Sequence, residues 1–339
     1  MTPAYGALRG VADAASALAA REKTAVLAIV VATMGAVQRP RGAMALLDAQ
    51  GICAGTLTGG VLEPRLETAA QAVLAGGRAD AVTLDLGDES ARAGSSSDNH
   101  SSVQIMILPL PVRTSSLREA IVTSCAGSAW LRLRLGLGRD DLDRRDLGRG
   151  EARTGSQVFS FDAGGHACPG PLVFDRHVSL AFAPPPRIAV LGAGPETRAL
   201  CRMARLLGWY VEVVETRERG LAQIDHAAVD RIHAIAPAAL PALIAGCHYD
   251  AAVVASHDFD IDAGHLRHLG AAGIGYIGLL GSPERRDALL SELGDIVATQ
   301  LEPRLYAPAG LRLGGEGPEA TALSIIAQLQ HYLTHDAHA

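Results

Sequence analysis

The sequence predicts an α/β protein in which an N-terminal α+β domain precedes a C-terminal Rossmann-like domain built on a doubly wound parallel sheet. Beyond residue 187, short apolar runs alternate with helical patterns to the end of the chain, as is typical of that sheet. The first run, 188–191, passes directly into Gly192, Gly194 and a helical pattern. Three consecutive prolines at 184–186 separate this half from the one before it.

Length and composition allow two folded domains. The 339 residues are 48% hydrophobic but only 4% aromatic, so we expect cores of alanine and aliphatic side chains. The triple proline forms a stiff linker, which places the boundary between domains 1–183 and 184–339.

Charge and cysteine content narrow the class of protein. The net charge of -6 argues against a nucleic-acid partner, and no apolar run reaches the ~18–20 residues of a membrane span. The chain shows no signal-peptide pattern, and its five dispersed cysteines contain no CxxC pair. We therefore expect a cytoplasmic protein with reduced thiols and no cysteine-based metal centre. The frequency of dimers among such proteins suggests a homodimer.

The N-terminal domain is expected to mix helices with antiparallel strands. A helical pattern at 7–20 precedes a buried strand at 24–32. A hairpin, a helix and further strands follow, at 44–48, 52–58, 63–74, 82–86, 103–108, 158–161 and 178–182. Residues 138–156 carry mixed charges, which predicts a solvated surface connection.

The C-terminal domain is expected to alternate strands and helices. The predicted strands are 188–191, 210–214, 232–236, 251–255 and 274–279. The predicted helices are 196–207, 263–271, 283–293 and 319–333.

The glycine turn is the first candidate site. In a dinucleotide fold the first glycine makes the turn, the second lets a phosphate approach the backbone, and the third allows close packing. Gly192 and Gly194 are present, Pro195 suits the first helical turn, and Thr197 replaces the third glycine. Glu215 ends the second strand, where an acid takes a ribose hydroxyl. Either a phosphate-bearing ligand lies on this helix N-terminus, or the fold is retained with an altered cleft.

Gly59, Gly60 and Glu63 form the second candidate site. They lie where a strand passes through two glycines into a helix, so backbone amides there are placed to hold an anion or an oxo group. The Glu63 carboxylate is either a functional group or only a favourable partner of the helix dipole.

Two further candidates lie at the ends of later strands. Residues His257 and Asp258 follow a buried strand. His257 is placed to move a proton or to bind a heterocycle. The alternative is that Asp258 only caps a turn and His257 is a surface residue. Ser282 is a good helix N-cap, and Arg285 follows at the end that disfavours positive charge. A bound phosphate would offset that charge, whereas the alternative is a solvated arginine.

Taken together, these segments resemble the xanthine dehydrogenase accessory protein family (XdhC/CoxI). The match rests on the order and spacing of six elements along nearly the whole chain. They are Gly59-Gly60 with Glu63, Pro-Pro-Pro-Arg at 184–187, Gly-Ala-Gly at 192–194, His257-Asp258, Tyr-Ile-Gly-Leu-Leu-Gly-Ser at 276–282, and Pro318-Glu319.

The resemblance implies a chaperone-like maturation factor rather than a turnover enzyme. Family members bind molybdenum cofactor and help insert its sulfurated form into molybdenum hydroxylases such as xanthine or carbon monoxide dehydrogenase. The implied ligand is molybdopterin, and the implied partners are the large subunit of such a hydroxylase and a cysteine desulfurase. The cofactor-binding candidates are Gly59, Gly60, Gly192, Gly194, Pro195, Glu215, His257, Ser282 and Arg285. Glu63, His257 and Asp258 are the candidates for proton transfer.

The chain departs from the family pattern at three places. Val61 stands where members commonly carry cysteine, Ser-Ser-Asp-Asn-His-Ser-Ser at 96–102 replaces a second cysteine motif, and Pro195 replaces a common histidine. Two other functions therefore remain open. One is a Rossmann-type NAD(P)-dependent oxidoreductase or nucleotide-handling enzyme, favoured by the glycine turn with Glu215 and opposed by the missing third glycine. The other is a cofactor-free scaffold for the client enzyme and a cysteine desulfurase.

Overall fold

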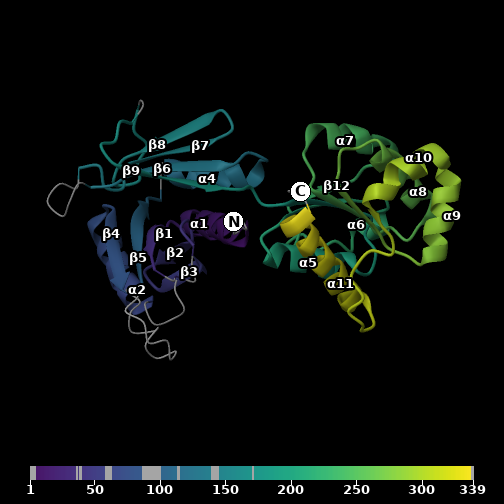
Figure 1. Cartoon of the computed structure of the whole chain (residues 1–339), viewed down its shortest axis with the longest axis horizontal. Coiled ribbons are helices and arrows are strands. Elements are labelled where there is room, and N and C mark those ends of the chain that lie inside the picture. Colours follow the sequence, from purple (N-terminus) through teal and green to yellow (C-terminus); the bar gives the residue numbers. More distant parts are fainter. Residues whose placement is uncertain are drawn as a thin grey trace. The chain divides into compact units, whose positions relative to one another are not determined.

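The chain divides between Pro185 and Pro186 into two compact units, here called the N-terminal and C-terminal units (Figure 1). The computed structural model describes residues 5–35, 37, 40–57, 63–85, 101–112, 115–138, 145–169 and 172–336. The mixed α/β architecture, with a parallel sheet in the C-terminal unit, confirms the predicted fold class.

A five-stranded antiparallel sheet forms the centre of the N-terminal unit, in the order β3-β2-β1-β5-β4. Its strands are β1 (Ala25–Met34), β2 (Met44–Asp48), β3 (Gly51–Gly55), β4 (Asp80–Asp85) and β5 (Ser102–Leu110). Helix α2 (Glu63–Gly76) shares a core with one face of this sheet, while α1 (Tyr5–Ala20) and α4 (Ser116–Ala126) share a core with the other. Both faces of β1 are therefore covered, which explains its continuous apolar run.

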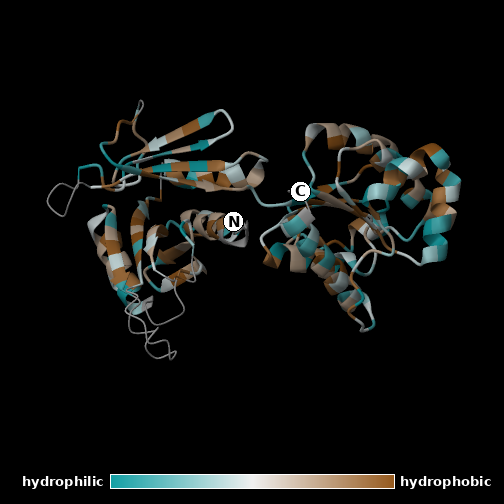
Figure 2. Ribbon diagram, viewed as in Figure 1, coloured by the Kyte–Doolittle hydropathy of each residue, from teal (hydrophilic) through white to brown (hydrophobic). Residues whose placement is uncertain are grey.

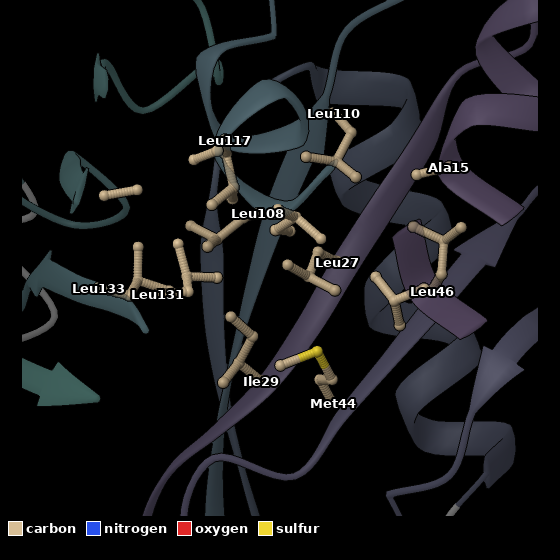
Figure 3. Close-up of a cluster of buried hydrophobic side chains, with 14 of the residues drawn as sticks. Ala15, Leu27, Ile29, Met44, Leu46, Leu108, Leu110, Leu117, Leu131 and Leu133 are labelled. Carbon is tan, nitrogen blue, oxygen red and sulfur yellow. The ribbon is translucent and has the colours of Figure 1, made fainter. Parts of the chain in front are cut away.

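A second antiparallel sheet packs into the core that contains α1 and α4, in the order β8-β7-β6-β9. Its strands are β6 (Leu131–Gly136), β7 (Gly150–Thr154), β8 (Gln157–Phe161) and β9 (His177–Phe182). Figure 3 shows Leu131 and Leu133 of β6 in the same cluster as Leu27 of β1. The prediction of a surface connection at 138–156 is wrong for 150–154, because β7 pairs on both sides and buries Ala152.

Six parallel strands form the C-terminal unit, in the order β12-β11-β10-β13-β14-β15. They are β10 (Arg187–Leu191), β11 (Tyr210–Val214), β12 (Arg231–His233), β13 (Ala251–Val254), β14 (Tyr276–Leu279) and β15 (Leu305–Tyr306). The helices are α5 (Thr197–Leu206), α6 (Glu218–Leu221), α7 (Leu240–Gly246), α8 (Phe259–Gly270), α9 (Pro283–Leu293), α10 (Asp295–Leu301) and α11 (Pro318–His331). The strand order reverses between β10 and β13, which makes this the switch point where doubly wound sheets bind ligands.

Helices cover both faces of the parallel sheet. Alternate residues of β10 enter two separate cores: Val190 packs with α5 and α11, and Leu191 packs with α7, α8 and α9. The strands of this sheet are accordingly among the most hydrophobic parts of the unit (Figure 2). Among the described residues, no helix combines the length and the apolar character that crossing a membrane requires.

Truncation of Leu27 tests the N-terminal core. Leu27 is fully buried, so Leu27→Ala is expected to lower the free energy of unfolding of this unit by about 2–5 kcal/mol, measured by urea denaturation followed by circular dichroism. Met34→Ala, on the same strand but 60% exposed, is the control and should cost less than ~0.5 kcal/mol. Equal losses in the two variants would contradict this packing.

Candidate functional site

Two predicted segments meet at the switch point of the C-terminal sheet. The glycine turn follows β10, and the segment with His257 follows β13, which is the neighbouring strand. Because the carboxyl ends of parallel strands share one edge of the sheet, the two loops lie against each other there. Residues that are far apart in the sequence therefore form one site within the C-terminal unit.

Both glycines of the turn are required by contact with the loop after β13. Gly192 has φ +106°, and a Cβ on it would lie 2.4 Å from the backbone N and Cα of Ser256. A Cβ on Gly194 would lie 2.7 Å from the carbonyl oxygen of Ala255 and 2.6 Å from Cδ2 of His257. The space that a dinucleotide's phosphate would need beside the second glycine thus contains this chain's own histidine.

The carboxylate of Glu215 is bound to the glycine turn. Its Oε2 accepts a hydrogen bond from the backbone N–H of Ala193 at 2.9 Å, and Arg217 donates to both carboxylate oxygens at 3.0 and 2.8 Å. Arg217 also donates to the carbonyl oxygen of Ser256 at 3.2 Å. Burial acts to raise the pKa of Glu215, but these hydrogen bonds outweigh it and lower the pKa to about 2. Glu215 therefore stays ionised, and both of its carboxylate oxygens accept hydrogen bonds from Ala193 and Arg217 of this chain.

His257 forms a hydrogen-bonded pair with Glu196 across the switch point. Its Nε2 lies 2.9 Å from Oε2 of Glu196, the residue that precedes α5. The Glu196 hydrogen bond raises the pKa of His257 against the opposing effect of burial, and the same bond lowers the pKa of Glu196. His257 has φ +58°, a conformation that non-glycine residues adopt rarely and often at functional sites. The sequence analysis did not name Glu196 as a site residue. The available signal was a carboxylate at the predicted start of a helix, where negative charge is favourable.

Three other predicted residues have structural partners in this unit. Asp258 caps α8 by accepting hydrogen bonds from the backbone of Asp260 and Ile261, and Ser282 caps α9 by accepting one from the backbone of Arg285. Arg285 donates to Oδ2 of Asp262 at 2.7 Å, so its charge is already balanced. Asp262 thus supplies the counter-charge that an arginine near a helix N-terminus needs, and Arg285 as a phosphate ligand stays a prediction.

Ser256, Asp262 and Arg285 form a hydrogen-bonded set that links the loop after β13 to α8 and α9. The Ser256 hydroxyl donates to Asp262 on α8, whose carboxylate also accepts from Arg285. His265, one helical turn further along α8, is buried, and burial lowers its pKa to about 4. The Nδ1 atom of His265 has no hydrogen-bond partner among the described residues. Asp262 thus connects α8 to the sheet edge, whereas His265 remains neutral.

The N-terminal candidates have a different outcome. Gly59 and Gly60 lie outside the described residues, and Glu63 is the first residue of α2. Within the described parts of the chain, no three histidine, cysteine or acidic side chains are grouped to hold a metal ion.

A pocket of about 530 Å³ lies beside α5. It is lined by the turn 193–195, by the first half of α5 including Arg198, and by the segment 222–229 that follows α6. Of the predicted residues, Gly194 and Pro195 line it. We call this the α5 pocket.

The switch point does not fit the dinucleotide that a Rossmann fold implies. A dinucleotide places its pyrophosphate on the glycine turn and a ribose hydroxyl on the acid after the second strand. Here His257 lies beside Gly194, and Glu215 is already bound to Ala193 and Arg217. The backbone N–H of Ala193, one of the turn amides that would bind a pyrophosphate, already donates to this carboxylate.

Two family models match the chain, one in each unit. The model of the XdhC Rossmann domain matches residues 188–329, and the model of the XdhC and CoxI family matches residues 18–86. The chain belongs to the XdhC and CoxI family. This confirms the resemblance carried by the sequence motifs.

Similar sequences and a similar fold are found among known proteins. A probable xanthine dehydrogenase subunit of Bacillus subtilis (strain 168) is 32% identical over 146 residues, which are 43% of this chain and 42% of that protein. Uncharacterized protein YqeB of Escherichia coli (strain K12) is 28% identical over 146 residues, or 42% of this chain and 27% of that protein. The chain thus spans less than half the length of either relative. A crystal structure described as a xanthine dehydrogenase from Bacillus halodurans has a TM-score of 0.69 at 24% identity over 95% of both chains, which confirms the fold.

Removal of the Glu196 charge tests the pair with His257. Glu196→Gln is expected to lower the pKa of His257, measured by NMR titration of the histidine ring, because the neutral amide no longer stabilises the imidazolium. Glu218→Gln, an exposed carboxylate on α6, is the control. The pair should stabilise the fold fully between pH 4.5 and 6.5, the ordinary pKa values of its partners. That contribution is lost as pH rises through the raised pKa of His257 or falls through the lowered pKa of Glu196.

Glu215→Gln tests the bond between the glycine turn and Arg217. The variant is expected to destabilise the C-terminal unit by about 1.5–3 kcal/mol in chemical denaturation at pH 7, because it loses charge-assisted hydrogen bonds in a buried position. Since the pKa of Glu215 is lowered from 4.5 to about 2, the difference from the wild type should shrink as pH falls through that range. A pH-independent difference would show that the charge has no role.

Proposed function

We propose that the chain is a maturation factor that binds molybdenum cofactor and delivers it to a molybdenum hydroxylase. The observation that carries this proposal is the match of both units to the XdhC and CoxI family. A relative named as part of a probable xanthine dehydrogenase supports the coarser statement of a role in xanthine dehydrogenase maturation. The recipient would be the large subunit of such a hydroxylase. A cytoplasmic location, a homodimer and a cysteine desulfurase as second partner stay predictions from the sequence.

The residues of the C-terminal unit suit the organic part of the cofactor. The α5 pocket is open to solvent and combines an arginine with polar and apolar side chains, which matches a phosphate-bearing pterin better than it matches a metal ion. The described cysteines are dispersed as free thiols, with Cys201 buried and its pKa raised by burial to about 12. The bound cofactor would supply the redox chemistry of the client enzyme, and this chain would bind and position its pterin and phosphate.

The alternative of an NAD(P)-dependent oxidoreductase lacks support from the geometry. Its strongest sequence argument is Glu215, and that carboxylate is held by Ala193 and Arg217. The scaffold that carries no cofactor remains an outcome of the test below.

Reconstitution of a client enzyme tests the proposal. Purified full-length protein is expected to retain a pterin that becomes fluorescent on oxidation, and to speed the activation of a cofactor-free molybdenum hydroxylase. Heat-denatured protein and an equal amount of free cofactor are the controls. Binding of the client without any pterin would favour the scaffold, and absence of both effects would overturn the proposal.

A further inference from the structure

The α5 pocket has the dimensions and lining of a small-ligand site. Its volume of about 530 Å³ lies within the ~300–1,000 Å³ range of such pockets. Ala193, Ile224 and Val229 supply apolar lining. The polar side chains that line the pocket are Thr197, Arg198, Gln223, Asp225 and His226. The lining is mixed, with slightly more polar than apolar surface, which suits a polar ring that carries a charged substituent.

Arg198 supplies the positive charge of the pocket. Its side chain is 62% exposed, and its nearest carboxylate, Asp225, lies 3.9 Å away. That carboxylate is already neutralised by Arg202, which donates to it at 2.7 Å. Arg198 therefore retains donors for an incoming anion, and a guanidinium binds phosphate oxygens in a bidentate manner. Arg198 lies in the first turn of α5, and the helix dipole at that end favours a bound anion.

Gln223 and His226 supply polar groups from a second element. Both line the pocket from the segment after α6, and neither side chain forms a hydrogen bond with the described residues. An amide and an imidazole offer both donors and acceptors, which is the complement of the edge of a nitrogen heterocycle. Ile224 and Val229, from the same segment, contribute apolar surface for a ring face.

The pocket is separate from the route that a dinucleotide takes. It lies between α5 and the segment 222–229, whereas the switch point is bridged by Glu196 and His257. A ligand in the pocket approaches the turn from the side of Pro195 and does not require those residues to separate.

We propose that the α5 pocket binds a planar nitrogen heterocycle carrying a single phosphate, with Arg198 on the phosphate and Gln223 and His226 on the ring edge. Two sources share this chemistry, the pterin phosphate of the cofactor and a nucleoside monophosphate. The pterin source rests on the proposed function, whereas the pocket and its Arg198 anchor do not.

Calorimetric titration of the full-length protein tests the site. The probes are guanosine monophosphate, guanosine, the oxidised pterin phosphate obtained from the cofactor, and NADH. Arg198→Gln should weaken binding of a phosphate-bearing probe about tenfold or more, and leave guanosine unchanged, because only the phosphate contact is lost. Gln223→Ala should weaken both guanosine and its monophosphate. Arg219→Gln, an exposed arginine outside the pocket, is the matched control.

Each outcome assigns or removes the site. Binding of the pterin phosphate alone identifies the cofactor as the ligand, and binding of guanosine monophosphate alone identifies a mononucleotide. The proposal is overturned if neither phosphate probe binds, if Arg198→Gln binds like the control, or if NADH binds as tightly and displaces them. Failure of client activation with intact, Arg198-dependent binding would remove the proposed function and leave the site in place.

Discussion

The buried carboxylate of Glu215 holds the carboxyl edge of the C-terminal sheet together. It accepts a hydrogen bond from Ala193 in the turn after β10, and it binds Arg217, which reaches the carbonyl oxygen of Ser256 after β13. One charge therefore connects three strands. Burial alone would neutralise such a group, and only the number of donors directed at it keeps it ionised. The glycine turn thus contains an anion that is part of the chain.

This internal anion changes what the glycine motif means. A Gly-x-Gly turn before a helix is normally explained by close approach of a phosphate. In this chain the close approach is made by other parts of the protein, since the Ser256 backbone lies against Gly192 and the His257 ring lies against Gly194. Steric demand for glycine is the same in both cases. The motif therefore predicts the fold, which the structure confirms, but it does not by itself identify a ligand.

The predictions that succeeded concern features encoded by neighbouring residues, and those that failed concern contacts between residues far apart in the sequence. Strands β10, β11 and β13 are short apolar runs buried on both faces, so their own residues identify them. Strand β7, Gly-Glu-Ala-Arg-Thr, has no such pattern, because pairing with β6 and β8 decides its conformation. Arg285 pairs with a residue 23 positions away in the sequence, and His257 with one 61 positions away. Only the fold brings these partners into contact. Local sequence showed that Arg285 was misplaced for a helix dipole, but not that Asp262 neutralises it.

The arrangement of charges also bears on release of a ligand. A delivery protein must hold its ligand against solvent and then lose it to a client, so very strong anchoring would oppose its task. In the site that we propose, the phosphate would be bound by one largely exposed guanidinium, with Asp225 and Arg202 beside it as an already formed pair. A single charge-assisted contact of this kind is worth about 1.5–3 kcal/mol. A client that offers its own cation to the phosphate would need to outweigh only that contact, while the Glu215 bonds that maintain the turn stay intact.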